Sequence, residues 1–274
     1  MVTGVGQYEL DADTEVRRTG DHLWRGAVSD RWSIGPYPNG GYVLAIALNA
    51  IRQELPHPDP FTVTAHYLSP PQPAPIDVAV EVVRSGRGHS TAMARMLQDG
   101  KERVRVLANY GDHSQSQGPT IIQGQPPPMP PPDECPPQAN GRLPNGLIAA
   151  IRDRVEVRPA PGSMGWARGE PTGRAELGGW LRFADGRPVD TFALPLVADA
   201  MPPPIFDATP GGWVPTLELT VHVRARPAPG WMRCWFRTRF LINGYLEEDG
   251  EVWDERGRLV ALSRQLAWLN PAPG

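Results

Sequence analysis

The order of sequence signals along this chain of 274 residues repeats on either side of a proline-rich segment. In each half, a mostly apolar run, which has no helix breaker in the first half, is followed by several segments in which apolar and polar residues alternate. An uninterrupted apolar run of this length is typical of a buried helix, whereas alternation with period two is typical of a strand. The repeat therefore predicts two copies of one unit, each a buried helix followed by an antiparallel meander.

The two predicted units share their landmarks. Pro73-Ala74-Pro75 in the first half corresponds to Pro227-Ala228-Pro229 in the second, and Thr62 corresponds to Thr216. Asp99-Gly100 is a typical hairpin turn between two of the strands. The predicted first-half elements are a helix over 39–55 and strands over 61–68, 76–86, 90–100 and 101–111. Those of the second half are a helix over 189–201 and strands over 216–225, 231–241, 244–257 and 258–269.

The segment between the halves, TIIQGQPPPMPPPDECPP, cannot form a helix or an inner strand because proline lacks the amide donor and fixes φ. We therefore predict an N-terminal repeat over 1–118, a linker over 119–139 and a C-terminal repeat over 140–274. A β-sandwich with incidental helices is the alternative architecture.

Composition narrows the classes of function. The formal net charge is -3 and no long block of either sign occurs, which argues against a nucleic-acid partner. No stretch reaches the roughly 18 to 20 apolar residues of a membrane span, and the N-terminus lacks the pattern of a secretory signal, so we expect a cytoplasmic protein. Cys135 and Cys234 lie far apart and the six histidines are scattered, so neither a metal site nor a cofactor is expected. No G-x-S-x-G elbow is present, which disfavours an α/β-hydrolase.

Several segments resemble one family. NGGYVLAIALNAI is similar to the first-helix motif of the acyl-CoA thioesterase II-like enzymes, and HYLSPP followed by VEVVRSGRGHSTAMARMLQDGK is similar to their first-repeat strands. LVADA, PTLELTVHV and ALSRQLAWL resemble their three second-repeat segments. The likeness spans most of 24–269 and weakens through the linker and 140–181. It implies an α+β fold of the double hot-dog type, in which each of two tandem antiparallel sheets wraps around a central apolar helix.

The resemblance also implies a reaction and its residues. In that family an Asp, a Thr and a Gln orient a water that hydrolyses acyl-CoA, and the matching positions are Asp199, Thr216 and Gln265. The family pattern also has a His after the acidic residue of the strand that follows the Thr. Here Leu219 follows Glu218, and this departure leaves the acyl-chain preference open.

The same residues can be read from physical chemistry. Asp199 has apolar neighbours, which would raise its pKa and suit a general base, although a helix ending near Pro202 would expose it instead. Gln265 alternates with small residues on a face that a helix could approach, unless it lies on a solvated edge strand. Strict alternation would point Thr216 away from the apolar core, unless the strand begins irregularly after Pro215.

Two glycines complete the candidate site. Gly40 and Gly41 open the first helix, where backbone amides could bind the oxyanion of a thioester, or where glycine could serve only close packing. Because a thiolate leaves readily, aiming the water is the main task. The alternatives are a hot-dog hydratase or dehydratase, which would need a His near the Asp, and a non-catalytic acyl-CoA or lipid-binding protein. The expected partners are acyl-CoA and further copies of the chain, as a homodimer or higher oligomer.

Overall fold

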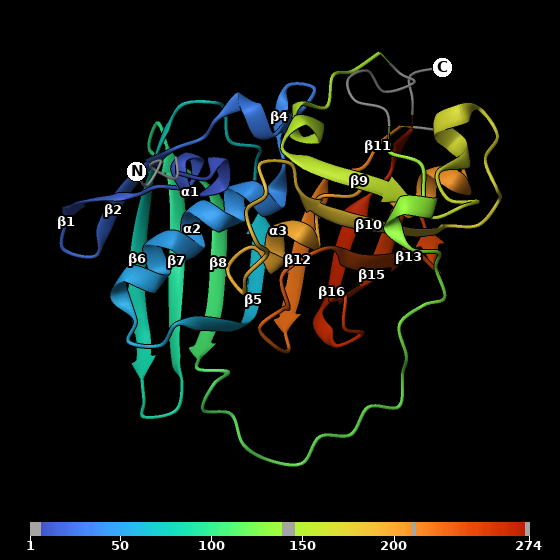
Figure 1. Ribbon diagram of the computed structural model, residues 1–274. Helices are drawn as coiled ribbons and strands as arrows, with labels where there is room; N and C mark the ends of the chain where they lie inside the picture. The colour runs from blue at the N-terminus through green and yellow to red at the C-terminus, as the bar shows by residue number, and fades with distance from the viewer. Residues whose placement is uncertain (1–6, 139–145, 210–211, 272–274) are drawn as a thin grey trace, which may run out of the picture.

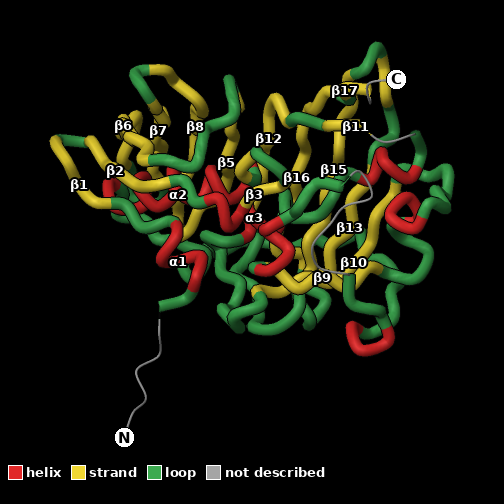
Figure 2. Tube along the Cα trace, turned by 90° about the horizontal axis from the view of Figure 1, so that it is seen from above, coloured by secondary structure: helices red, strands yellow, loops and turns green. Residues whose placement is uncertain are grey.

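One antiparallel sheet runs through both halves of the chain. The computed structural model describes residues 7–138, 146–209 and 212–271, which form a 13-stranded sheet. The strand order is β1-β2-β6-β7-β8-β5-β12-β16-β15-β13-β10-β9, with β14 paired to β15. β5 (Asp59–Tyr67) and β12 (Thr216–Val223) are neighbours, with Val63 opposite Val221, so the two halves join at this pair. The sheet curves around the helices α2 and α3 (Figure 2).

The first half has the elements that the sequence predicts. The apolar run forms α2 (Gly40–Glu54), in which residues 41 to 51 are buried, and Asn39 caps its first turn by accepting a hydrogen bond from the Tyr42 amide. The Asp99-Gly100 turn has positive φ at both residues, as a two-residue hairpin requires. The strands of the meander are β5, β6 (Pro75–Ser85), β7 (Ser90–Gln98) and β8 (Lys101–Gly111), and α2 crosses one face of them (Figure 1).

The helix predicted over 189–201 is wrong in extent. Only α3 (Leu194–Val197) is helical, and turns surround it. Pro195 lies in its first turn, where proline is tolerated, but Pro202, Pro203 and Pro204 follow five to seven residues after its end and cannot donate the hydrogen bonds of a continuing helix. Asp199 therefore lies in the turn after a short helix, not inside a long one.

The second-half strands follow the prediction, with one break. They are β12, β13 (Met232–Arg237), β15 (Tyr245–Trp253) and β16 (Leu259–Trp268). The predicted strand over 231–241 stops at Arg237, and β14 (Leu241–Ile242) is a separate short strand. Two strands in the weakly patterned region were not predicted, namely β10 (Glu176–Phe183) and the edge strand β9 (Val155–Pro159).

Smaller elements complete the described chain. The N-terminal edge of the sheet is formed by β1 (Arg17–Gly20) and β2 (Leu23–Ala27), and α1 (Glu9–Asp13) precedes them. Two short ladders pair β3 (Ser33–Ile34) with β4 (Tyr37–Pro38), and β11 (Gly212–Trp213) with β17 (Asn270–Pro271). The 3₁₀ turns are Asp30–Trp32, Pro132–Glu134, Ala150–Asp153, Gly165–Arg168 and Pro204–Asp207. In the described part of the chain, no helix is both long and apolar enough to cross a bilayer.

The proline-rich segment runs as an extended connection along the outside of the molecule (Figure 1). Between the end of β8 and residue 131 it has no helix or strand. Its carbonyls bind side chains of the second-half sheet: Arg233 donates to Pro127 (3.1 Å), Trp180 to Pro130 (2.8 Å) and Arg158 to Pro132 (2.9 Å). The predicted boundary at 139 and 140 lies outside the described residues, and the division into repeats stays a prediction.

Candidate active site

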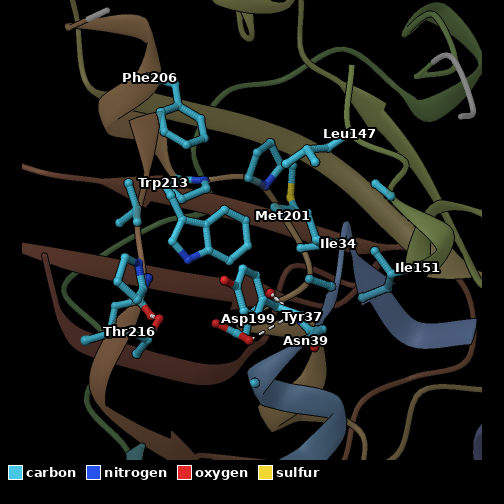
Figure 3. A pocket seen from close by; sticks show the side chains of 18 of the residues that line it. Ile34, Tyr37, Asn39, Leu147, Ile151, Asp199, Met201, Phe206, Trp213 and Thr216 are labelled. Atoms are coloured by element: carbon cyan, nitrogen blue, oxygen red, sulfur yellow. Dashed lines mark hydrogen bonds between the residues drawn. The ribbon is translucent and has the colours of Figure 1, made fainter. Parts of the chain in front are cut away.

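A cavity of about 1200 Å³ lies where the first-half helix meets the turn after α3. Its wall combines the N-terminus of α2, the start of β12 and the end of β16 with loops of the second half (Figure 3). Asp199, Thr216 and Gln265 all line it, although they come from three separate segments of the chain. The fold thus brings the three predicted polar side chains to one space.

Asp199 is held from the first half of the chain. Its Oδ2 accepts hydrogen bonds from the Gly41 amide at 2.7 Å and from Asn39 Nδ2 at 2.9 Å. Asn39 Nδ2 also donates to the Asp199 backbone carbonyl at 2.8 Å, while its Oδ1 caps α2. Figure 3 shows Asn39 and Asp199 facing each other beneath the aromatic wall. The carboxylate is therefore fixed in position before any ligand arrives.

Burial raises the pKa of Asp199 to about 6, even though the hydrogen bonds from Gly41, Asn39 and Gly40 lower it. The residue borders the cavity and is half-buried, with protein on its other sides. A carboxylate with this pKa is ionised near neutral pH and is a stronger base than a solvated one. These are the properties of a general base.

Gly40 and Gly41 allow neighbouring segments to approach the start of α2 closely. A Cβ on Gly41 would lie 2.8 Å from the Leu196 Cα, so α2 and α3 could not meet as they do with a larger residue there. A Cβ on Gly40 would lie 3.1 Å from Asp199 Oδ2 and 3.0 Å from the Tyr67 hydroxyl. Gly40 lines the cavity, and the Gly41 amide is occupied by Asp199. Their expected role in binding substrate stays a prediction.

Thr216 points toward Gln265 because β12 begins irregularly. The register of β12 against β16 shifts between Thr216 and Glu218. Such a bulge turns the Thr216 side chain toward the core, whereas strict alternation would point it away from the core. The Thr216 hydroxyl then donates to Gln265 Oε1 at 3.0 Å. Gln265 is only 7% exposed and lies on a strand with neighbours on both sides, not on a solvated edge.

Glu248 is an acid of this region that the sequence did not single out. It lies directly opposite Gln265 in the β15–β16 pair and is 6% exposed. Burial and, to a smaller extent, the negative charge of Asp199 raise its pKa to about 8, against the lowering effect of the Gln265 side chain. Its Oε2 has no hydrogen-bond partner among the described residues. In sequence Glu248 belongs to the acidic run LEEDG, where nothing distinguishes it from its solvated neighbours.

Another acid on the wall has a structural task. Both Asp207 carboxylate oxygens accept backbone amides, from Gly165 at 3.2 Å and Trp166 at 2.8 Å, and so hold a loop in place. Asn39 was also missed, yet an Asn at the start of a predicted helix is a standard N-cap signal and could have marked it.

The rest of the wall is mostly apolar and rich in aromatic rings. Tyr37 and Trp213 lie with ring centroids 5.0 Å apart, and Trp166 meets Phe206 edge-on at 5.1 Å. Aliphatic side chains fill the remaining surface, as Figure 3 shows for Ile34, Leu147, Ile151 and Met201. A wide apolar cavity with a few convergent polar groups is the usual form of a small-molecule site.

Comparisons with known proteins show which family this chain resembles. The family model for the acyl-CoA thioesterase N-terminal domain matches residues 28–111, and that for the C-terminal domain matches 132–269. An uncharacterized protein of Mycobacterium tuberculosis is 28% identical, over 90% of this chain and 91% of its own.

Two crystal structures are similar over nearly their whole length. A Thermobifida fusca protein, named as a proposed thioesterase II, has a TM-score of 0.89 at 28% identity, over 97% of this chain and 99% of its own. A protein of unknown function from Alicyclobacillus acidocaldarius, described as having a hot-dog fold, has a TM-score of 0.84 at 24% identity, over 97% and 100% of the two chains. The large antiparallel sheet with few helices is thus a hot-dog fold. With both domain models matched in order and over most of its length, the chain belongs to the acyl-CoA thioesterase family.

Proposed function

We propose that this chain hydrolyses acyl-CoA thioesters to a carboxylic acid and free CoA, with a water held among Asp199, Thr216 and Gln265. The observation that supports this most strongly is the convergence of the three side chains on one apolar cavity, where Asp199 is positioned by Asn39 and Gly41. Its raised pKa makes it the strongest candidate base on the cavity wall.

The reaction needs one water and no further reagent. Asp199 accepts a proton as the water oxygen attacks the thioester carbonyl carbon, which forms a tetrahedral oxyanion. The carbon–sulfur bond then breaks, and CoA leaves as a thiolate. Because the pKa of a thiol is about 8.5, the leaving group needs little help, and the proton on Asp199 can finally neutralise it. Thr216 and Gln265, already hydrogen-bonded to each other, would hold the water in line.

The cavity wall also bears on the alternatives. A hydratase or dehydratase would need a histidine beside the acid, and no histidine is among the described residues that line the cavity. A non-catalytic acyl-CoA-binding protein would use the same apolar wall, so only turnover distinguishes it.

The deciding experiment is a panel of acyl-CoA esters of different chain length, branching and ring content, with a thiol reagent to detect free CoA. Release of CoA by the wild-type protein, and loss of release in Asp199→Asn, is the expected result. Binding of an ester without CoA release by the wild type would show a binding protein and overturn hydrolysis.

The same proposal includes two expectations about the cell. We expect the protein to act in the cytoplasm and to associate as a homodimer or a larger oligomer. Light scattering at micromolar concentration should then give at least twice the chain mass of 30.0 kDa. A mass of one chain would contradict the association.

A further inference from the structure

We propose that Glu248 is a positioning residue that fixes the side-chain amide of Gln265 in the orientation that the water requires. The inference rests on the proposed hydrolysis and goes beyond its three predicted residues. Glu248 does not line the cavity and would not touch the substrate, so it would act through Gln265.

The orientation of the Gln265 amide follows from its two neighbours. Thr216 donates its hydroxyl hydrogen to Gln265 Oε1, so the oxygen of the amide faces β12. Glu248, on the opposite neighbouring strand, is the direct cross-strand partner of Gln265, so its buried carboxyl lies beside the nitrogen end of the amide. With Thr216 bonded to its oxygen and an acceptor beside its nitrogen, the amide has one favoured orientation, and an N–H remains available to the cavity.

Burying the Glu248 carboxyl at this position lowers the stability of the fold, which suggests that the residue has a function there. The buried face of β15 otherwise includes Leu246, Gly250 and Val252, none of which carries a polar side chain. A buried carboxyl with one unpartnered oxygen is destabilising compared with an apolar side chain of similar size. Positions with such a cost are concentrated at functional sites.

The charges around Glu248 favour its neutral form. The negatively charged group that faces it from another segment is Asp199, whereas Asp249 on its own strand points outward to Arg264 and Arg239. Glu248 should therefore carry a proton at neutral pH, which leaves one negative charge, on Asp199, for the reaction. Polar side chains thus follow one another across three neighbouring strands, from Thr216 through Gln265 to Glu248.

Two substitutions test the role by kinetics. Glu248→Leu removes the acceptor of the Gln265 N–H and should lower kcat by roughly 10- to 100-fold with little change in KM, because a misplaced orienting group affects the chemical step. Glu248→Gln keeps an acceptor and should retain kcat within about threefold at pH 7. It should also abolish any loss of activity above pH 8, since the variant has no carboxyl to ionise. The matched control is Glu247→Gln and Glu247→Leu, the same changes on the outer face of the same strand.

A measurement without substrate separates this inference from the proposed function. The side-chain amide signals of Gln265 in a ¹⁵N NMR spectrum can be assigned by their absence in Gln265→Ala. In the wild type they should shift as pH passes through about 8, and in Glu248→Gln that shift should disappear. Amide signals that ignore pH between 6.5 and 9.5, or a folded Glu248→Leu with wild-type kcat, would overturn the positioning role. Failure of the wild type to release CoA would instead overturn only the hydrolysis.

Discussion

Asn39 holds Asp199 at two points with one amide group, since its Nδ2 lies 2.9 Å from the carboxylate Oδ2 and 2.8 Å from the backbone carbonyl of the same residue. The other end of the Asn39 side chain caps α2. A single residue of the first half therefore couples the start of the central helix to the acid of the second half.

Replacing Asp199 by Asn should lower kcat by roughly two to four orders of magnitude, the usual range for losing a general base. The variant keeps the size and polarity of the side chain, so the Kd for a non-hydrolysable acyl-CoA analogue should change little. Steady-state kinetics and calorimetry measure the two quantities. If the variant hydrolysed its best substrate at nearly the wild-type rate, Asp199 would not be the base.

The same variant should be more stable than the wild type at neutral pH. The pKa of Asp199 is raised from 3.8 to about 6, so the folded state binds the proton more tightly than the unfolded state. The wild type therefore loses stability as pH rises from about 4 through 6, by about 2 to 3 kcal/mol. Asp199→Asn should remove that loss, and denaturant unfolding of both proteins at pH 4 and pH 7 measures it. An equal difference at both values would contradict the titration.

Activity should follow a bell-shaped pH profile. The acidic limb should rise through about 6 as Asp199 ionises, and activity should fall above about 8 as Glu248 ionises and adds a second negative charge next to Gln265. The kcat/KM of the free enzyme, corrected for hydroxide hydrolysis, is the quantity to measure. A rate independent of pH between 5 and 7 would exclude Asp199 as the titrating base.

Replacing Asn39 by Asp should move the acidic limb to higher pH. Asp still caps the helix, so α2 is preserved, but a carboxylate replaces the donor to Asp199 and repels its negative charge. Asn49→Asp is a useful comparison, because Asn49 is also on α2 and donates to the Thr14 carbonyl, away from the cavity. A shift of the limb in the Asn49 variant alone would argue against the assigned contact.

Gly41→Ala should destabilise the fold. The added Cβ would lie 2.8 Å from the Leu196 Cα, and backbone atoms cannot give way as a flexible side chain can. Gly88→Ala is the control, because nothing lies within 4 Å of its added Cβ. The melting temperature should fall by several degrees in the first variant and stay within about a degree in the second. Equal melting temperatures would show that the two helices can separate without cost.

Helices and strands that depend on the local residue pattern could be predicted from the sequence. Features that depend on contacts with a distant segment of the chain could not. α2 and the four strands after it follow directly from an apolar run and from alternation. The second helix was overestimated because apolar residues continue past α3, although the prolines from Pro202 onward end it. The resemblance to the thioesterase family was confirmed by the match to both domain models.

The candidate site could also be predicted only in part from the sequence. Asp199, Thr216 and Gln265 could be named from the resemblance, and the structure places them around one cavity. The direction of Thr216 depends on a shift of register against β16, which strand alternation cannot reveal. Glu248 can be recognised only from its cross-strand pairing with Gln265. The sequence of an acidic run does not show which of its members is buried. The catalytic roles themselves stay predictions.

The pairing of β5 with β12 makes the two halves interdependent. Asn39 and Gly41 come from one half and Asp199 from the other, so neither half alone contains a complete set of contacts to the acid. If the gene were split within the linker, the two fragments would have to associate before the contacts to Asp199 could form. Damage to either half would therefore disturb the contacts that hold Asp199.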